Sequence, residues 1–475
     1  MPQPEKHIDA LIIGSGQGGT PLAKKLASSG WQTVLIEKRY IGGTCINDGC
    51  TPTKTMIADG RLAYTIRGAA ARGIYTQGLS IDLSKIMERK NGVVTSFREG
   101  SEKGLSATKN LSVIKGEASF TGPKSISVLL EDGGTELYTA DKIFINAGCS
   151  PFIPSLKGLD KVPYLTSTTL LDIDRIPSHL LVLGGGYIAL ELGQLFRRLG
   201  SEVSIIERSA TLLAREDPDI QAAVKQILES EGIRFYTKTQ VKEVLPVGVP
   251  TGGAGGVPTD ADHIRLDLQH DEDQESITGT HLLVAAGRGP QTKALNLEKA
   301  GILLDEKGYI KVDEYLQTNV PGVYALGDIK GGPAFTHISY NDYVILYKNL
   351  LENQKQSIRD RLVPYCVFTD PPLGRVGLTE TQAREQGYKI KVAVLPMTRV
   401  ARAIETGNTK GMMKAIVDAG TGLILGAAIL GEEGGEIMTV LQMAMLGGIT
   451  YDRIRDMVIA HPLYAESLNN LFMSI

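Results

Sequence analysis

Two cysteines separated by four residues, Cys45 and Cys50, are the side chains of this sequence best suited to two-electron redox chemistry. A disulfide needs its two Cα atoms within roughly 7 Å, whereas five residues of a regular helix rise about 7.5 Å. The pair can therefore close only at an irregular helix start, which Gly49 and Pro52 permit. A redox-active pair is favoured. The alternatives are unrelated thiols or half of a metal site, although no other Cys-rich or His-rich cluster would complete such a site.

A glycine-rich dinucleotide fingerprint precedes the cysteines. The buried strand Ala10–Ile13 leads into a glycine loop, an amphipathic helix to about Ser29 and a second strand, Thr33–Ile36, that ends at Glu37. Such glycines allow a tight turn and close approach to a pyrophosphate at a helix N-terminus, and the acid accepts from a ribose hydroxyl. The fingerprint glycines of this loop, those at the spacing of the dinucleotide motif, are Gly14, Gly16 and Gly19.

The same unit occurs a second time. The strand Leu180–Leu183 leads into Gly184 and Gly186, a helix to about Leu199, and a strand that ends at Glu207. Two dinucleotide sites imply electron transfer between two bound nucleotides. Because the cysteines belong to the first unit, the first site is expected to hold FAD and the second a nicotinamide nucleotide. The alternative for either unit is a structural turn without a ligand.

The C-terminal segment adds a histidine and a carboxylate, His461 and Glu466. An imidazole near a thiol can take and return protons at neutral pH, and a carboxylate can orient its other ring nitrogen. A His–Glu pair can equally be structural.

Composition excludes several function classes. The 475 residues carry a formal net charge of −3 with dispersed signs, which argues against nucleic acid or an anionic membrane as the main partner. The sequence lacks the order of a signal peptide and an apolar stretch of about 20 residues for a membrane span. Four cysteines do not make a secreted disulfide framework, so a cytoplasmic enzyme without a metal site is expected.

Taken together, these motifs resemble the FAD-dependent pyridine nucleotide–disulfide oxidoreductases of class I, which include glutathione reductase, dihydrolipoamide dehydrogenase and mercuric reductase. The resemblance covers nearly the whole chain and extends to Ile145–Gly148, Ala286–Arg288 and Ala325–Asp328. The nearest branch resembles bacterial reactive-chlorine-resistance flavoproteins associated with hypothiocyanous acid reduction, through Thr44–Asn47 and Pro52–Thr55 among other segments.

The resemblance implies an α/β fold with two Rossmann-like dinucleotide-binding domains and a C-terminal α+β dimerisation domain. The implied FAD domain is discontinuous, 1–150 and 281–345; the NAD(P) domain is 151–280 and the dimerisation domain 346–475. It also implies a homodimer in which His461 and Glu466 reach the active site of the other subunit.

Residue roles are likewise implied by the resemblance. Cys45 would be the interchange thiol that meets substrate, and Cys50 the charge-transfer thiol against the flavin. Lys54 would approach flavin N5 and pair with Glu191, and Tyr187 would cover the nicotinamide pocket. Ala118 would contact the adenine side of FAD, Asp328 the ribityl chain and Thr336 the flavin region; the remaining implied cofactor-binding residues are Gly43, Thr44, Gly148 and Gly287.

The nicotinamide nucleotide is expected to be NADH. Glu207 can accept from the ribose 2′-hydroxyl and would repel a 2′-phosphate. Arg208, the next residue, keeps NADPH open because a cation there could pair with that phosphate.

The expected reaction passes electrons from NAD(P)H through FAD to Cys45–Cys50 and on to a small oxidant, hypothiocyanous acid or a related reactive species. A mercuric or metal-ion reductase is one alternative, although the chain ends Phe472–Ile475 without the vicinal cysteines usual in that enzyme. A dihydrolipoamide dehydrogenase-like enzyme and a non-catalytic redox-sensing flavoprotein are the others. The sequence assigns no role to the following residues: Asp48, Cys149, Cys366, His337, Arg399 and Arg402.

Overall fold

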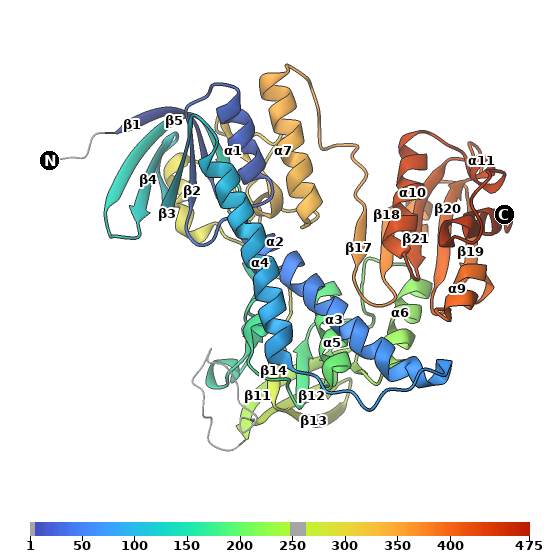
Figure 1. Cartoon of the computed structure of the whole chain (residues 1–475). Coiled ribbons are helices and arrows are strands. Elements are labelled where there is room, and N and C mark those ends of the chain that lie inside the picture. The colour runs from blue at the N-terminus through green and yellow to red at the C-terminus, as the bar shows by residue number, and fades with distance from the viewer. Residues whose placement is uncertain (1–4, 248–262) are drawn as a thin grey trace. The chain divides into compact units, whose positions relative to one another are not determined.

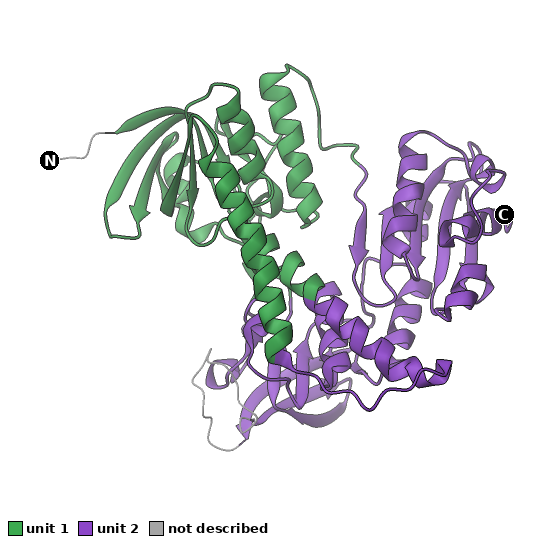
Figure 2. Ribbon diagram, in the orientation of Figure 1, with its two compact units in different colours: residues 1–55, 84–152, 287–361 green, residues 56–83, 153–286, 362–475 purple. Residues whose placement is uncertain are grey.

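A computed structural model describes residues 5–247 and 263–475. The described chain divides into two compact units (Figure 2), and each is interleaved along the sequence. Unit 1 comprises Met1–Thr55, Ser84–Phe152 and Gly287–Arg361; unit 2 comprises Met56–Leu83, Ile153–Ala286 and Leu362–Ile475. The division into FAD, NAD(P) and dimerisation domains with the boundaries given above stays a prediction.

Unit 1 is built on a largely parallel sheet. Strand β1 pairs in parallel with both β2 and β5, β2 pairs with β3, and β5 pairs with β16. Strand β4 is antiparallel to β3 and β5. The bounds are β1 Lys6–Ile13, β2 Thr33–Glu37, β3 Leu111–Gly122, β4 Ser125–Leu130, β5 Thr135–Ile145 and β16 Val323–Ala325. A two-stranded ladder joins β6, Cys149–Pro151, to β15, Arg288–Pro290.

Both faces of this sheet are buried, which is why β1 and β2 contain the continuous apolar runs Ala10–Ile13 and Val34–Ile36 rather than alternating ones. Helices α1 and α7 lie side by side (Figure 1) and contribute Leu22, Leu26, Ile345 and Leu346 to the core over one face. The helices that begin in unit 1 are α1 Gly19–Ser28, α2 Gly43–Asn47, α3 Cys50–Gly68 and α7 Thr336–Leu351, and α4, Leu83–Ser106, lies in unit 1 apart from its first residue. The carboxyl ends of the parallel strands therefore meet the N-termini of α1 and α7.

Unit 2 contains a second parallel sheet in the order β10-β9-β8-β14-β7. Its bounds are β7 Leu165–Thr166, β8 His179–Leu183, β9 Glu202–Ile206, β10 Arg234–Tyr236 and β14 His281–Val284, and the helices are α5 Tyr187–Leu199 and α6 Pro218–Ser230. A three-stranded antiparallel sheet follows: β11 Thr239–Val247, β12 His263–His270 and β13 Asp273–Gly279. Both βαβ units predicted from the glycine fingerprints are thus present.

The C-terminal part of unit 2 is an antiparallel sheet in the order β17-β18-β21-β20-β19. Its strands are β17 Tyr365–Val367, β18 Leu373–Gly377, β19 Ile390–Pro396, β20 Met412–Asp418 and β21 Ile424–Leu430. Its helices are α8 Glu380–Glu385, α9 Ala401–Thr406, α10 Gly434–Leu446, α11 Tyr451–Arg455 and α12 Ser467–Phe472. Helices α10 and α12 close the core over this sheet with Ile437, Leu441, Leu468 and Phe472. This mixture of helix and antiparallel sheet is the predicted α+β architecture.

Within residues 5–247 and 263–475, the structure contains no helix with the length and apolar character that spanning a membrane requires.

Candidate active site: a dithiol between two helix starts

The two cysteines lie on either side of a helix break. Cys45 lies in the five-residue helix α2, which ends at Asn47, and Cys50 is the first residue of α3. Asp48 leaves helical geometry at φ −132°, and a Cβ on Gly49 would lie 2.9 Å from the Thr44 carbonyl oxygen. The irregular helix start expected between the cysteines is therefore present, and Gly49 allows the chain to pass close to α2.

The side chains of Cys45 and Cys50 are thiols in this structure, and they share a hydrogen bond. The Thr336 hydroxyl, at the first residue of α7, lies 3.4 Å from the Cys50 sulfur. Cys50 is thus placed at the start of one helix and beside the start of another. Helix N-termini stabilise thiolates, so this site favours a negative charge on Cys50.

The hydrogen bond to Cys50, together with burial, raises the pKa of the Cys45 thiol above its usual range. The Thr336 hydroxyl and the Lys54 ammonium act in the opposite direction. Because the two thiols interact, they titrate as a pair.

The loop before α1 fits the pyrophosphate of a dinucleotide. A Cβ added to Gly16 would lie 2.8 Å from the side-chain oxygen of Asn146, and one added to Gly19 would lie 2.1 Å from the Gly14 carbonyl oxygen. Only glycine therefore fits at these two positions. Helix α1 begins with a glycine cap and has no acidic residue in its first turn, so its amide groups are available to an anion. Gly43 packs against Gly16, and its Cβ would lie 2.8 Å from that Cα.

Glu37 stands at the end of β2, as predicted for a ribose acceptor. Its carboxylate accepts from the Ser15 backbone N–H at 2.9 Å, the Ser15 hydroxyl at 2.7 Å and the Arg39 backbone N–H at 2.8 Å. A carboxylate has about four acceptor positions, which leaves room for a ribose hydroxyl. The residues present therefore fit the adenosine end of FAD.

Two site residues were missed by sequence reasoning. The Asn146 side chain accepts from the Gly19 N–H at 2.9 Å and donates to the Leu326 carbonyl at 2.8 Å, so it joins the loops at two strand ends. Its position directly after β5 was the available signal. Asp342, fully buried on α7, accepts from the Gly327 N–H at 2.8 Å and pairs with Lys330 and Arg361. No local sequence pattern marks Asp342.

Asp328 follows β16 in the 3₁₀ turn Gly327–Lys330. Burial raises the pKa of this carboxyl group, and the cations Arg288 and Lys330 oppose that rise. Ala118 is buried on β3, and Gly148 and Gly287 have positive φ values of 69° and 127°. The cofactor contacts of these residues stay predictions.

The second fingerprint reproduces the first. Glu207 accepts from the Gly185 N–H at 2.6 Å and from the Ser209 N–H at 2.6 Å, and α5 begins at a glycine cap without an acidic first turn. A Cβ on Gly184 would lie 2.5 Å from the Ala285 carbonyl oxygen. Arg208 is exposed. Tyr187 is the first residue of α5, and its place over the nicotinamide pocket stays a prediction.

Glu191 is 2 % exposed, and its carboxylate accepts from the Phe368 N–H at 2.8 Å. The predicted pairing of Lys54 with Glu191 stays a prediction.

His461 and Glu466 are brought together as expected. The Nδ1 atom of His461 lies 3.0 Å from one carboxylate oxygen of Glu466 and 3.1 Å from the other. The His461 side chain is 67 % exposed within the single chain, so its Nε2 edge is open to a partner. This is the geometry in which a carboxylate orients an imidazole.

The residues without an assigned role take ordinary positions. Cys149 is buried, and burial raises the pKa of its thiol to about 12, which makes it unreactive at neutral pH. The ring of His337 stacks on that of Phe335, with 5.3 Å between the ring centres. Arg402 forms an exposed ion pair with Glu405, and Arg399 is exposed. Cys366 is half-buried on β17.

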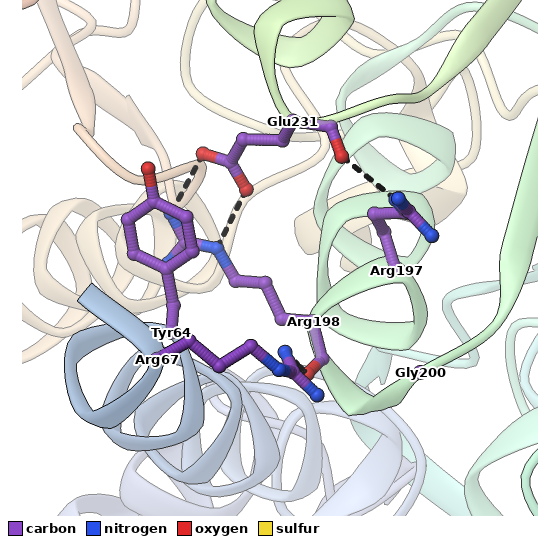
Figure 3. Close-up of a pocket in the computed structure, with 6 residues that line it drawn as sticks. All are labelled: Tyr64, Arg67, Arg197, Arg198, Gly200 and Glu231. Atoms are coloured by element: carbon purple, nitrogen blue, oxygen red, sulfur yellow. Dashed lines mark hydrogen bonds and ion pairs between the residues drawn. The ribbon is translucent and has the colours of Figure 1, made fainter. Parts of the chain in front are cut away.

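A separate pocket of about 290 Å³ in unit 2 contains none of the predicted site residues (Figure 3). Its buried Arg198 pairs with both oxygens of Glu231 at 2.8 Å and lies 4.0 Å from the centre of the Tyr64 ring. Arg67 and Arg197 donate to carbonyl groups at the ends of α5 and α6. Arg67 and Arg197 thus cap helix C-termini. The polar groups that line this pocket are used to hold the fold together. In the described part of the chain, no three His, Cys, Asp or Glu side chains form a metal site.

Comparison with known proteins agrees with the fold. The model of the pyridine nucleotide-disulphide oxidoreductase family matches residues 8–342, and the model of its dimerisation domain matches residues 363–472. The probable pyridine nucleotide-disulfide oxidoreductase RclA of Escherichia coli K12 is 38% identical over 467 residues, which are 98% of each chain. A mercuric reductase of Staphylococcus aureus is 35% identical over 97% of this chain and 81% of its own.

Among solved structures, a Cu(II) complex of the HOCl-induced flavoprotein disulfide reductase RclA from Escherichia coli superposes with a TM-score of 0.87. It is 36% identical, and the match covers 98% of this chain and 99% of that one. The chain therefore belongs to the pyridine nucleotide–disulfide oxidoreductase family, as its motifs predicted. It is an FAD-dependent enzyme that takes electrons from NAD(P)H.

Proposed function

We propose that this enzyme reduces a small thiol-reactive oxidant, hypothiocyanous acid or a related species, with electrons from NADH. The observation that carries the proposal is the hydrogen-bonded pair Cys45–Cys50 at the break between α2 and α3, where the Cys50 sulfur lies 3.4 Å from the Thr336 hydroxyl. A dithiol of this kind reduces an oxidant that contains an electrophilic sulfur or chlorine atom. The relative RclA, described as an HOCl-induced flavoprotein disulfide reductase, supports the same class of substrate.

Bound FAD would supply the transfer of an electron pair from the nicotinamide to the disulfide. In the chain's own part of the reaction, the Cys45 sulfur attacks the sulfur of hypothiocyanous acid, and water leaves. Cys50 then attacks the Cys45 sulfur, thiocyanate leaves, and the disulfide closes. Over a full cycle, NADH and HOSCN give NAD⁺, thiocyanate and water, which balances two electrons and all protons.

Cys45 needs a base for this attack, because the hydrogen bond to Cys50 raises the pKa of its thiol. We propose a homodimer, supported by the dimerisation-domain match, in which His461 of the partner subunit takes that proton. Glu466 orients the ring through its contacts to Nδ1. A cytoplasmic location belongs to the same proposal, since disulfides of cytosolic proteins are usually transient and catalytic, as this one would be.

The nucleotide sites complete the proposal. FAD would bind at Gly14, Gly16, Gly19 and Glu37, with the further contacts to Gly43, Thr44, Ala118, Gly148, Asp328 and Thr336 that the sequence predicted. NADH would bind at Gly184, Gly186, Tyr187 and Glu207. The parallel hydrogen bonds of Glu37 and Glu207 support a ribose at each.

The test is steady-state NADH oxidation by the purified holoenzyme with hypothiocyanous acid, compared in wild type, Cys45→Ser and Cys366→Ser. We expect Cys45→Ser to lose turnover and Cys366→Ser to retain it, because Cys366 lies outside the dithiol. Full turnover in Cys45→Ser contradicts the proposal.

A second candidate is reduction of Cu(II) or Hg(II) at the same thiols. A relative whose structure is a Cu(II) complex and the related mercuric reductases favour it. To separate the candidates, kcat/KM of the holoenzyme is measured with each acceptor in parallel: Cu(II), Hg(II), lipoamide and hypothiocyanous acid.

A further inference from the structure

We propose that Arg98 is a positioning residue for the redox thiols. Through Asn47 it holds the short helix α2 in the place where Cys45 meets Cys50. The inference deepens the proposed function and rests on its dithiol, but it concerns residues on a different helix, α4, and it can be measured without any oxidant.

Asn47 is the last residue of α2, two positions after Cys45. Its amide nitrogen donates to the Ile41 carbonyl at 3.0 Å and to the Gly43 carbonyl at 2.9 Å, and its amide oxygen accepts from Arg98 Nε at 2.8 Å. Two carbonyl acceptors and one guanidinium donor permit only this orientation of the amide. The side chain thus closes the beginning of α2 onto its end and joins both to α4.

Arg98 is itself held in place. Its guanidinium carbon lies 4.3 Å from the centre of the Tyr40 ring, a cation–π distance. Tyr40 belongs to the segment between β2 and α2, so Arg98 contacts the chain just before the helix that carries Cys45 as well as the last residue of that helix. A helix of five residues has little stability of its own, and these outside contacts set its position.

The neighbouring pair Arg39–Asp48 is weaker by comparison. Asp48 binds Arg39 at 3.0 Å and 3.3 Å, but the Arg39 side chain is 53 % exposed. Solvent screens such a surface pair. Asp48, between the two cysteines, therefore contributes less to the position of α2 than Asn47 does.

The position of α2 is expected to affect the equilibrium between the Cys45–Cys50 disulfide and the dithiol. Closing the disulfide depends on the effective concentration of one thiol at the other. Releasing α2 from Arg98 lowers that concentration and destabilises the disulfide relative to the dithiol. Loss of the contact is expected to shift the equilibrium toward the dithiol about tenfold, which for a two-electron couple corresponds to about 30 mV.

The experiment equilibrates each holoenzyme with graded mixtures of reduced and oxidised dithiothreitol. The two protein thiols lose two electrons and two protons, which convert oxidised dithiothreitol to its dithiol. Alkylation and mass spectrometry then count the Cys45–Cys50 disulfide. We expect Arg98→Ala to shift the equilibrium about tenfold, and Arg98→Lys to recover part of it by donating to Asn47.

Lys103→Ala is the matched control, because it removes an exposed cation from the same helix. It should stay within twofold of wild type, as should Asp48→Asn. A double-mutant cycle tests the route: in an Asn47→Ala background, Arg98→Ala should have little further effect.

An Arg98→Ala equilibrium within twofold of wild type overturns the proposal, and so does an undiminished Arg98 effect in the Asn47→Ala background. If the Arg98→Ala protein did not retain FAD, the dithiol–disulfide equilibrium of Arg98→Gln would be compared with that of wild type instead. Loss of oxidant turnover in wild type would contradict the proposed function and leave this equilibrium measurable. The absence of any Cys45–Cys50 disulfide in wild type contradicts both.

Discussion

The hydroxyl of Thr336 lies 3.4 Å from the sulfur of Cys50, although 286 positions separate the two residues in the sequence. Each is the first residue of a long helix, Cys50 of α3 and Thr336 of α7. A thiol at one helix start therefore receives a hydroxyl from another. Both features favour a negative charge at this end of the dithiol.

Replacing Thr336 tests this relationship. The Thr336 hydroxyl acts to lower the pKa of Cys45, the direction expected of a donor to an ionised thiol pair. Thr336→Val removes the donor, so the reduced pair should ionise at higher pH, and the profile for iodoacetamide alkylation should move upward. The expected size of the shift follows from the lost hydrogen bond, since a hydrogen bond to a charged group contributes about 1.5–3 kcal/mol to the stability of the charged form. Thr336→Ser keeps the hydroxyl and should keep the profile; a shift in the serine variant as large as in valine would exclude the hydroxyl as the cause.

The two cysteines should respond differently to substitution. Cys45→Ser should abolish oxidant reduction, yet it should retain FAD and the long-wavelength absorption of a thiolate beside the flavin, because Cys50 remains. Cys50→Ser should lose that absorption on two-electron reduction. Reductive titration followed by absorption spectroscopy makes the comparison, and full turnover in both variants would rule out the dithiol.

Gly49 should be required for the turn between the cysteines. In Gly49→Ala the new methyl group would lie 2.9 Å from the Thr44 carbonyl oxygen, and such overpacking typically costs about 1–3 kcal/mol. We expect slower turnover and a lower Tm. Gly68→Ala, at the last residue of α3 and with no atom within 4 Å of the new Cβ, is the control and should leave both unchanged. Equal behaviour of the two variants would show that the close approach is not needed.

The sequence predicted those parts of the site that local chain geometry dictates. Glu37 and Glu207 each end a strand that follows a glycine loop, so their place beside that loop follows from the βαβ unit. The break between Cys45 and Cys50 followed from helix rise and the reach of a disulfide, with Gly49 and Pro52 as the residues that permit it. Arg98 and Asp342 could not be found in this way, because each acts on a backbone or amide far along the sequence. Such contacts depend on tertiary packing and leave no local pattern.

His461 should act in the half-reaction with oxidant. His461→Ala should slow reoxidation by substrate far more than reduction by NADH, because general acid–base catalysis contributes about 10²–10⁴-fold. Stopped-flow measurement of each half-reaction separates the two. Mixed dimers of Cys45→Ser and His461→Ala should recover part of the activity if the site spans two chains. Verified mixed dimers without any recovery would argue against a shared site.

Glu207 should select the nicotinamide nucleotide. Its two oxygens accept from the N–H groups of Gly185 and Ser209 at 2.6 Å, so the carboxylate is fixed beside the glycine loop. A ribose 2′-hydroxyl can donate to it, whereas a 2′-phosphate would be repelled.

Arg208 is the cation that could oppose this preference, but it is exposed, and solvent weakens its attraction for a phosphate. We therefore expect wild type to prefer NADH and Glu207→Ala to shift kcat/KM toward NADPH, with Arg208→Ala as the companion variant. Glu207→Gln keeps the acceptor oxygen without the charge and should shift the preference less. A wild-type preference for NADPH, or an unchanged preference in Glu207→Ala, would mean that the carboxylate does not read the 2′ position.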